Sequence, residues 1–211
     1  MRRLSVIAIA ILACERPASV PARWTRPAVV FLGDSLTEGQ GVRPEESYPS
    51  LLERRMKSAG LDLPVVNAGI SGDATDGALS RLERIAASPV SVLFVALGVN
   101  DAVRFRRSPE EIRSNLTRII ERGRAARARV VLAGMKLPIS FPEEYRRSFE
   151  NIYPELAKQY GIPLVPFLLE GVAADPALTQ GDGLHPNAPG YRRVAEVVWP
   201  VIEPVIRSAS R

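Results

Sequence analysis

Five apolar runs rich in β-branched residues recur along the chain. They cover residues 28–32, 64–68, 90–97, 129–134 and 162–167. Continuous apolar runs of this length are typical of strands that are buried on both faces of a sheet. Amphipathic segments of helical length lie between or after them, at residues 47–59, 75–87, 109–127, 143–160 and 188–207.

This alternation predicts one α/β domain over residues 28–211. Strands that alternate with helices form a parallel sheet covered on both sides, with right-handed crossovers. A chain of 211 residues is long enough for one sizeable core, and the sequence contains no internal repeat or low-complexity tract. Ligands of such folds bind beyond the carboxyl ends of the strands. The residues that directly follow the apolar runs are therefore the candidate site residues.

The charges of the chain are mixed along its length. The net charge is +5, nearly all the cations are arginine, and they alternate with acidic residues. A nucleic-acid-binding domain usually has a denser basic face with aromatic partners, so we do not expect nucleic acid as a ligand. His185 and Cys14 are the only histidine and cysteine, which excludes an internal disulfide and the usual zinc sites. We expect no metal and no other cofactor.

Residues 1–13 are predicted to be a signal peptide, because two arginines precede an apolar stretch too short to span a bilayer. Cys14 follows directly, in a sequence similar to a bacterial lipobox. Lipidation at Cys14 would anchor a periplasmic protein to the membrane. Cleavage elsewhere would give a soluble exported protein. Residues 14–27 are rich in proline and arginine, which predicts an exposed linker.

The stretch GDSLTEG follows the first apolar run and has two interpretations. Ser35 and Glu38 have the spacing of a capping box, in which a serine and a glutamate satisfy the first N–H groups of a helix. Alternatively, Ser35 is a nucleophile at the ligand-binding edge of the sheet. A serine hydroxyl reacts only when a base takes its proton, so this second interpretation requires a base nearby.

His185 is the only histidine available as that base. Asp182 precedes it by three residues, and a turn through Gly183 would bring the carboxylate to one ring nitrogen while the other faces Ser35. The same stretch also predicts the start of the last helix, with Asn187 as its cap and Pro189 in its first turn. The two interpretations are compatible.

Three groups after the strands are candidate donors to an oxyanion. They are the backbone N–H of Ser35, Gly72 and the side-chain amide of Asn100. Taken singly, Gly72 also fits an ordinary turn and Asn100 an Asx turn at a strand end. Their common position at strand ends of one predicted sheet favours a shared site.

Four sequence blocks together resemble the SGNH (GDSL) hydrolase family over about residues 28–206. The blocks are GDSL with Ser35, NAGISGD with Gly72, GVND with Asn100, and DGLHP with Asp182 and His185. The C-terminal half is similar to the bacterial multifunctional thioesterase/arylesterase/lysophospholipase subfamily. The resemblance implies a flavodoxin-like three-layer sandwich with a five-stranded parallel sheet of order 2-1-3-4-5.

The resemblance also implies roles for the residues in the blocks. Ser35 would be the nucleophile, His185 the base and Asp182 the residue that orients it, while Gly72 and Asn100 would complete the oxyanion hole with the Ser35 N–H. The third block departs from the frequent Gly-Gly-Asn-Asp pattern at Val99, which we expect to narrow the space near Asn100.

These residues predict a serine hydrolase that cleaves carboxylic esters, and also thioesters, of acyl or aryl substrates including lysophospholipids through an acyl-enzyme. Two alternatives stay open: an acyltransferase that uses the same triad, and a non-catalytic module that binds envelope glycans or lipids. We expect a monomer, because no long coiled coil or large apolar helix face is apparent. The predicted substrate pocket consists of Val99, Phe105, Leu137, Ile139 and Phe141, with arginines of 102–107 at its mouth, although these loops also fit packing and solvated surface.

Overall fold

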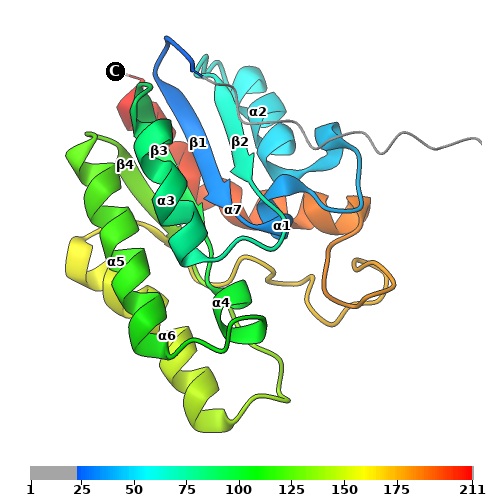
Figure 1. Ribbon diagram of the computed structural model, residues 1–211. Coiled ribbons are helices and arrows are strands. Elements are labelled where there is room, and N and C mark those ends of the chain that lie inside the picture. The colour runs from blue at the N-terminus through cyan, green and yellow to red at the C-terminus, as the bar shows by residue number, and fades with distance from the viewer. Residues whose placement is uncertain (1–22, 211) are drawn as a thin grey trace, which may run out of the picture.

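The computed structural model describes residues 23–210. The predicted signal peptide, Cys14 and the linker up to residue 22 lie outside this range. The strands form one parallel sheet of order β2-β1-β3-β4-β5 (Figure 1), which confirms the predicted flavodoxin-like topology. The strands are β1 (Ala28–Gly33), β2 (Val65–Gly69), β3 (Val90–Ala96), β4 (Arg129–Ala133) and β5 (Leu164–Val165).

Helices cover both faces of the sheet, as a three-layer sandwich requires (Figure 1). One layer consists of α3 (Thr75–Ala86), α5 (Pro109–Ala125) and α6 (Glu143–Tyr160), which pack side by side. The other layer consists of α2 (Tyr48–Ser58) and α7 (Ala188–Ala209). Within residues 23–210, no helix has the length and apolar character needed to cross a lipid bilayer.

Three short elements lie between the long ones, and of these only a helix start near Ser35 was predicted. They are α1 (Ser35–Glu38), a 3₁₀ turn η1 (Pro44–Glu46) and α4 (Val99–Val103). Elements of this length are too short to show a helical period in the sequence. The last helix begins where its predicted capping residue places it: Asn187 caps α7 and accepts the Gly190 N–H at 3.0 Å.

The centre of the core is formed by β1 and β3 and the helix α2 that packs on them. All six residues of β1 are buried, and its Phe31 packs against Phe94 of β3 and Tyr48 of α2, with ring centroids 5.3 and 5.6 Å away. The Tyr48 hydroxyl is hydrogen-bonded to Thr37 of α1 at 2.8 Å. Packing of these aromatic rings fixes the carboxyl end of β1, from which α1 departs.

β5 is much shorter than the predicted strand at residues 162–167. Only Leu164 and Val165 pair with β4. Pro163 and Pro166 flank them, and proline has no N–H to donate to the ladder. The apolar run is still buried at Val165, so hydrophobicity alone predicted the strand but overestimated its length.

Arg81 of α3 is a buried cation at the carboxyl edge of the sheet. Its guanidinium donates to the carbonyl of Ala68 in β2 at 2.6 Å and to that of Gly33 in β1 at 3.1 Å. It also forms an ion pair with Asp73 at 2.8 Å, with side-chain exposures of 8% for Arg81 and 11% for Asp73. Arg81 therefore joins the ends of β1 and β2 to the loop that follows β2.

We predict that Arg81→Met lowers the free energy of unfolding by about 3–5 kcal/mol, because it leaves the Asp73 carboxylate in a nearly buried position without its cation. Urea unfolding measures the change. Arg84→Met is the matched control, since Arg84 is exposed on the same helix and such surface changes stay within about 0.5 kcal/mol. Equal stability of the two variants would contradict the role of Arg81.

Candidate active site

Ser35 is the first residue of α1, at the carboxyl end of β1. Asp34 is the helix cap, and its Oδ1 accepts the Leu36 N–H at 3.0 Å. The capping-box interpretation of Ser35 is therefore wrong, because the cap lies one residue earlier than it requires. The N–H of a first helical residue has no acceptor within its helix. Ser35 thus has a hydroxyl and a backbone N–H available at the same edge.

Glu38 has a different role from the predicted one. Because Asp34 is the cap, Glu38 stands one position beyond the place that a capping-box glutamate takes. Its carboxylate accepts the Ser71 N–H at 2.7 Å and also contacts the Ser71 hydroxyl. Glu38 therefore holds the loop that contains Gly72 instead of the start of its own helix.

His185 lies between Ser35 and Asp182, as the sequence predicted. Its Nε2 is 2.9 Å from Ser35 Oγ, and its Nδ1 is 2.6 Å from Asp182 Oδ2. The other carboxylate oxygen of Asp182 accepts the N–H groups of Leu184 and His185 at 2.9 and 3.0 Å, across a turn in which Gly183 has φ +68°. These hydrogen bonds, first that from the His185 ring, lower the pKa of Asp182 to about 2. Asp182 is therefore a carboxylate at neutral pH and accepts a hydrogen bond from the Nδ1–H of His185.

Gln180 fixes the loop that contains His185. Its backbone N–H donates to the His185 carbonyl at 2.7 Å, and its side-chain amide donates to the carbonyls of Gln40 and Pro186 at 2.7 and 2.9 Å. Gln40 follows α1 directly, so Gln180 connects the histidine loop to the segment that contains Ser35. Gln180 was not predicted, because a single polar side chain in a loop forms no pattern in the sequence.

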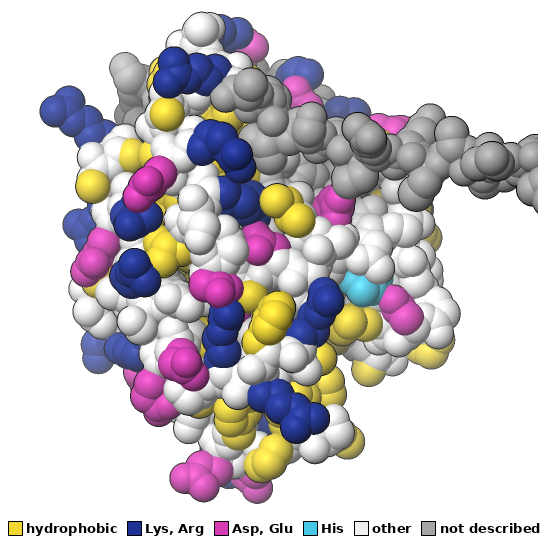
Figure 2. Space-filling model, in the orientation of Figure 1, with side chains coloured by type: hydrophobic (Ala, Val, Ile, Leu, Met, Phe, Trp, Pro, Cys, Tyr) yellow, Lys and Arg dark blue, Asp and Glu magenta, His cyan; other side chains and the backbone are white. Residues whose placement is uncertain are grey.

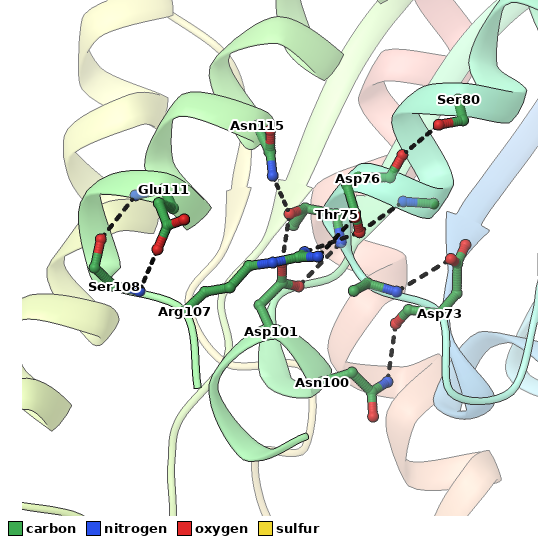
Figure 3. A network of polar contacts seen from close by, with 12 residues as sticks. Asp73, Thr75, Asp76, Ser80, Asn100, Asp101, Arg107, Ser108, Glu111 and Asn115 are labelled. Carbon is green, nitrogen blue, oxygen red and sulfur yellow. Dashed lines mark hydrogen bonds and ion pairs between the residues drawn. The ribbon is translucent and has the colours of Figure 1, made fainter. Parts of the chain in front are cut away.

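Gly72 and Asn100 lie on neighbouring loops. Gly72 adopts φ +78°, which favours glycine. The amide of Asn100 in α4 donates to the carbonyl of Asp73 at 2.9 Å (Figure 3). The same amide nitrogen lies 3.4 Å from Asp34 Oδ2. This arrangement brings the amide of Asn100 close to the residues on either side of the site, Asp34 beside the serine and Asp73 beside the glycine.

A buried carboxylate holds the Asn100 loop in place. Asp101 accepts the N–H and the hydroxyl of Thr75 at 3.0 and 2.6 Å, and Arg107 donates to it at 2.7 Å (Figure 3). Arg107 also pairs with Asp76 of α3, and Asn115 of α5 donates to the Thr75 hydroxyl at 2.9 Å. The network connects α4 to the starts of α3 and α5. The network was not predicted, since its residues contact one another only in the folded protein. Arg107, one of the arginines expected at the mouth of the pocket, is instead bound by Asp76 and Asp101.

The five residues of the predicted pocket lie in different environments. Val99 begins α4 and packs against the core, as does Leu137, which is 6% exposed. Phe141 stacks on Tyr145 at 5.9 Å between ring centroids. Phe105 and Ile139 expose 51% and 90% of their surface. Their role in binding an acyl chain stays a prediction.

A serine, a histidine and a carboxylate hydrogen-bonded in series at the carboxyl edge of a parallel sheet place the protein among the serine hydrolases. The model of the GDSL-like Lipase/Acylhydrolase family matches residues 31–193, and the chain belongs to this family. It is a carboxylic ester hydrolase, as predicted.

Known relatives cover most of the chain. An arylesterase of Vibrio mimicus is 36% identical over 81% of this chain and 85% of its own length. The thioesterase 1/protease 1/lysophospholipase L1 of Escherichia coli is 34% identical over 86% of each protein. The crystal structure of TesA superimposes with a TM-score of 0.80 at 35% identity and covers 84% of this chain and 99% of that one.

Asp34 is an acidic group beside Ser35 that is almost completely buried, with 2% exposure. Burial raises its pKa from 3.8 to about 7, and the negative charge of Asp73 adds to this effect. The folded protein therefore holds the Asp34 proton more tightly than the unfolded chain does. This contribution to stability is complete below about pH 4 and is lost as the pH rises towards 7.

We predict that Asp34→Asn becomes more stable relative to the wild type as the pH rises, because the amide stays neutral where the buried carboxyl must ionise. At about 1.4 kcal/mol per pH unit, the difference in unfolding free energy changes by up to about 4 kcal/mol between pH 4 and 7. Urea unfolding of both proteins across this range measures it. A difference that is constant with pH would show that Asp34 ionises at its ordinary pKa.

Proposed function

We propose that the protein hydrolyses acyl and aryl esters through an acyl-enzyme formed on Ser35. The hydrogen-bonded series from Ser35 Oγ to His185 Nε2 and from His185 Nδ1 to Asp182 carries this proposal. Ser35 attacks the ester carbonyl while His185 Nε2 takes its proton, and the ionised Asp182 stabilises the imidazolium that results. His185 then gives the proton to the departing alcohol.

The developing negative charge on the carbonyl oxygen needs donors that are already in place. We assign this role to the backbone N–H groups of Ser35 and Gly72 and to the amide of Asn100. The loop of Gly72 is held by Glu38, and the amide of Asn100 by the carbonyl of Asp73. In the second half of the reaction, His185 deprotonates a water molecule that attacks the acyl-enzyme, and the free acid leaves.

The substrates proposed here include thioesters and lysophospholipids. The support comes from two relatives, an arylesterase and a thioesterase 1/protease 1/lysophospholipase L1, each of which matches more than four fifths of this chain. All three substrate classes present an acyl carbonyl to the same nucleophile, so one site serves them without additional groups.

We predict that Ser35→Ala lowers kcat for p-nitrophenyl acetate by about 10⁴-fold or more, because no other group in the series can form the acyl-enzyme. A spectrophotometric assay measures the rate. Ser58→Ala, at an exposed position in α2, is the matched control and retains wild-type turnover. Undiminished hydrolysis by the Ser35 variant would disprove the mechanism.

Labelling by a fluorophosphonate probe separates this proposal from a module that only binds its ligand. The wild type reacts at Ser35, the Ser35→Ala variant does not, and circular dichroism establishes that the variant is folded. A folded wild type that fails to react and fails to hydrolyse any ester of an aryl, thioester and lysophospholipid panel would favour the binding module.

We further propose that the protein is exported and anchored through a lipid on Cys14. The support is the basic and apolar leader followed directly by a cysteine. We predict that cells expressing the full chain incorporate an alkyne-labelled fatty acid into the protein and that Cys14→Ser abolishes this label. Label that persists in the variant would place the lipid elsewhere, and an unlabelled wild type in the periplasm would indicate soluble export.

A further inference from the structure

Arg104 lies beside the proposed oxyanion donors. It ends α4, and its backbone N–H donates to the Asn100 carbonyl at 2.9 Å, so the two side chains are one helical turn apart. Its guanidinium extends to the loop after β2 and covers Gly72. A Cβ on Gly72 would lie 3.3 Å from Arg104 Cζ and would collide with Nη1. The positive charge is therefore held between the residues proposed to bind the carbonyl oxygen.

The charge of Arg104 is not neutralised by the described part of the chain. Within residues 23–210, its guanidinium forms no ion pair and no side-chain hydrogen bond. Arg107, three residues later, is the opposite case, since Asp76 and Asp101 both bind it. Arg104 is exposed, and the face that contains His185 also presents other basic and apolar side chains (Figure 2).

The carboxylates near Arg104 are already engaged elsewhere. Asp73 is paired with Arg81, and Glu38 accepts from Ser71. Asp182 accepts from His185 on the far side of Ser35. An exposed guanidinium with free N–H groups binds phosphate or carboxylate oxygens in a two-pronged geometry.

We propose that Arg104 forms an anion subsite that binds a phosphate or carboxylate on the alcohol portion of the ester. This inference rests on the proposed function. The alcohol portion is the natural place for the anion, because the acyl chain is apolar whereas the alcohol portion of a lysophospholipid carries a phosphate. The enzyme then prefers esters of anionic alcohols to uncharged esters with the same acyl chain.

Paired substrates test the subsite. In the first pair, hexanoylglycerol phosphate is the anionic ester and hexanoylglycerol is the neutral one. In the second pair, the anionic ester is a hydroxy acid hexanoylated on its hydroxyl, and the neutral one is the same compound with its carboxylate methylated. We predict that Arg104→Gln lowers the ratio of kcat/KM for the anionic over the neutral ester by about tenfold, mainly through KM, because a charged hydrogen bond is lost. Arg104→Lys, which keeps the charge without the fork, retains part of the preference.

The control is Arg84→Gln. It also removes one arginine charge, but from the C-terminal end of α3, which is the end away from the Gly72 loop. This variant keeps the wild-type ratio. A loss in the phosphate pair alone would assign the site to phosphate, and a loss in both pairs to anions in general. An unchanged ratio in Arg104→Gln would overturn the proposal. This holds also if both esters slow by the same factor, because Arg104 would then act on the carbonyl oxygen and not on the anion.

The wild type provides a second test that needs no variant. Raising the salt concentration from about 10 mM to about 1 M shortens the screening length from about 30 to about 3 Å. The preference for the anionic ester must then fall, while hydrolysis of the neutral ester measures any general effect of salt. A preference that does not respond to salt would overturn the subsite. If the wild type cleaves neither member of a pair, the proposed hydrolase function itself fails.

Discussion

The hydrogen bond between Ser35 Oγ and His185 Nε2 joins residues that are 150 positions apart in the chain. The parallel sheet makes this contact possible, because it brings the end of β1 and the segment after β5 to one edge. The sheet does not fix the distance between them. Gln180 does so locally, by binding the carbonyl of Gln40 after α1 and the carbonyl of His185 in its own loop. A histidine loop without that connection would keep its turn at Asp182 but lose its position relative to Ser35.

The charged side chains at the carboxyl edge of the sheet fall into two groups: those that form ion pairs between loops and those that lie beside Ser35 and His185. Asp73 with Arg81 and Asp101 with Arg107 are ion pairs that hold loops, and in each pair at least one side chain is nearly buried. Such pairs add little net stability, but removing one partner is costly, and this gives the loops a defined arrangement. Asp34 forms no ion pair within residues 23–210, and its burial raises its pKa to about 7. The site therefore places a carboxyl that is partly neutral next to the serine and a fully ionised one, Asp182, next to the histidine.

The fold followed from the sequence because its signals are long and periodic. Apolar runs marked the strands, amphipathic segments marked the helices, and Asn187 marked the start of α7. The candidate site residues followed from a simple constraint, since there is one histidine and the ends of parallel strands share an edge.

The errors came from short-range geometry. Asp34 and Ser35 are both residues that commonly cap helices, so the sequence did not show that the cap lies at Asp34. Glu38 was therefore assigned to the wrong partner. The prolines beside β5 limited a strand that its hydrophobicity overestimated. Arg81, Gln180 and Asp101 act through contacts between distant segments, which one sequence does not encode in any local pattern.

Arg104 and Arg107 illustrate why charge in a sequence does not define function. Both belong to one stretch after the third block, and from the sequence both are solvated arginines of a loop. Folding gives Arg107 two carboxylates and makes it part of the scaffold. It gives Arg104 the backbone of Gly72, the ring of Phe105 with its centroid 6.0 Å from Cζ, and solvent. The glycine is thus constrained twice, by its positive φ and by the guanidinium that covers it. A larger residue there would be strained in its backbone and would displace the guanidinium, so the conformation of the Gly72 loop also determines where the charge of Arg104 lies.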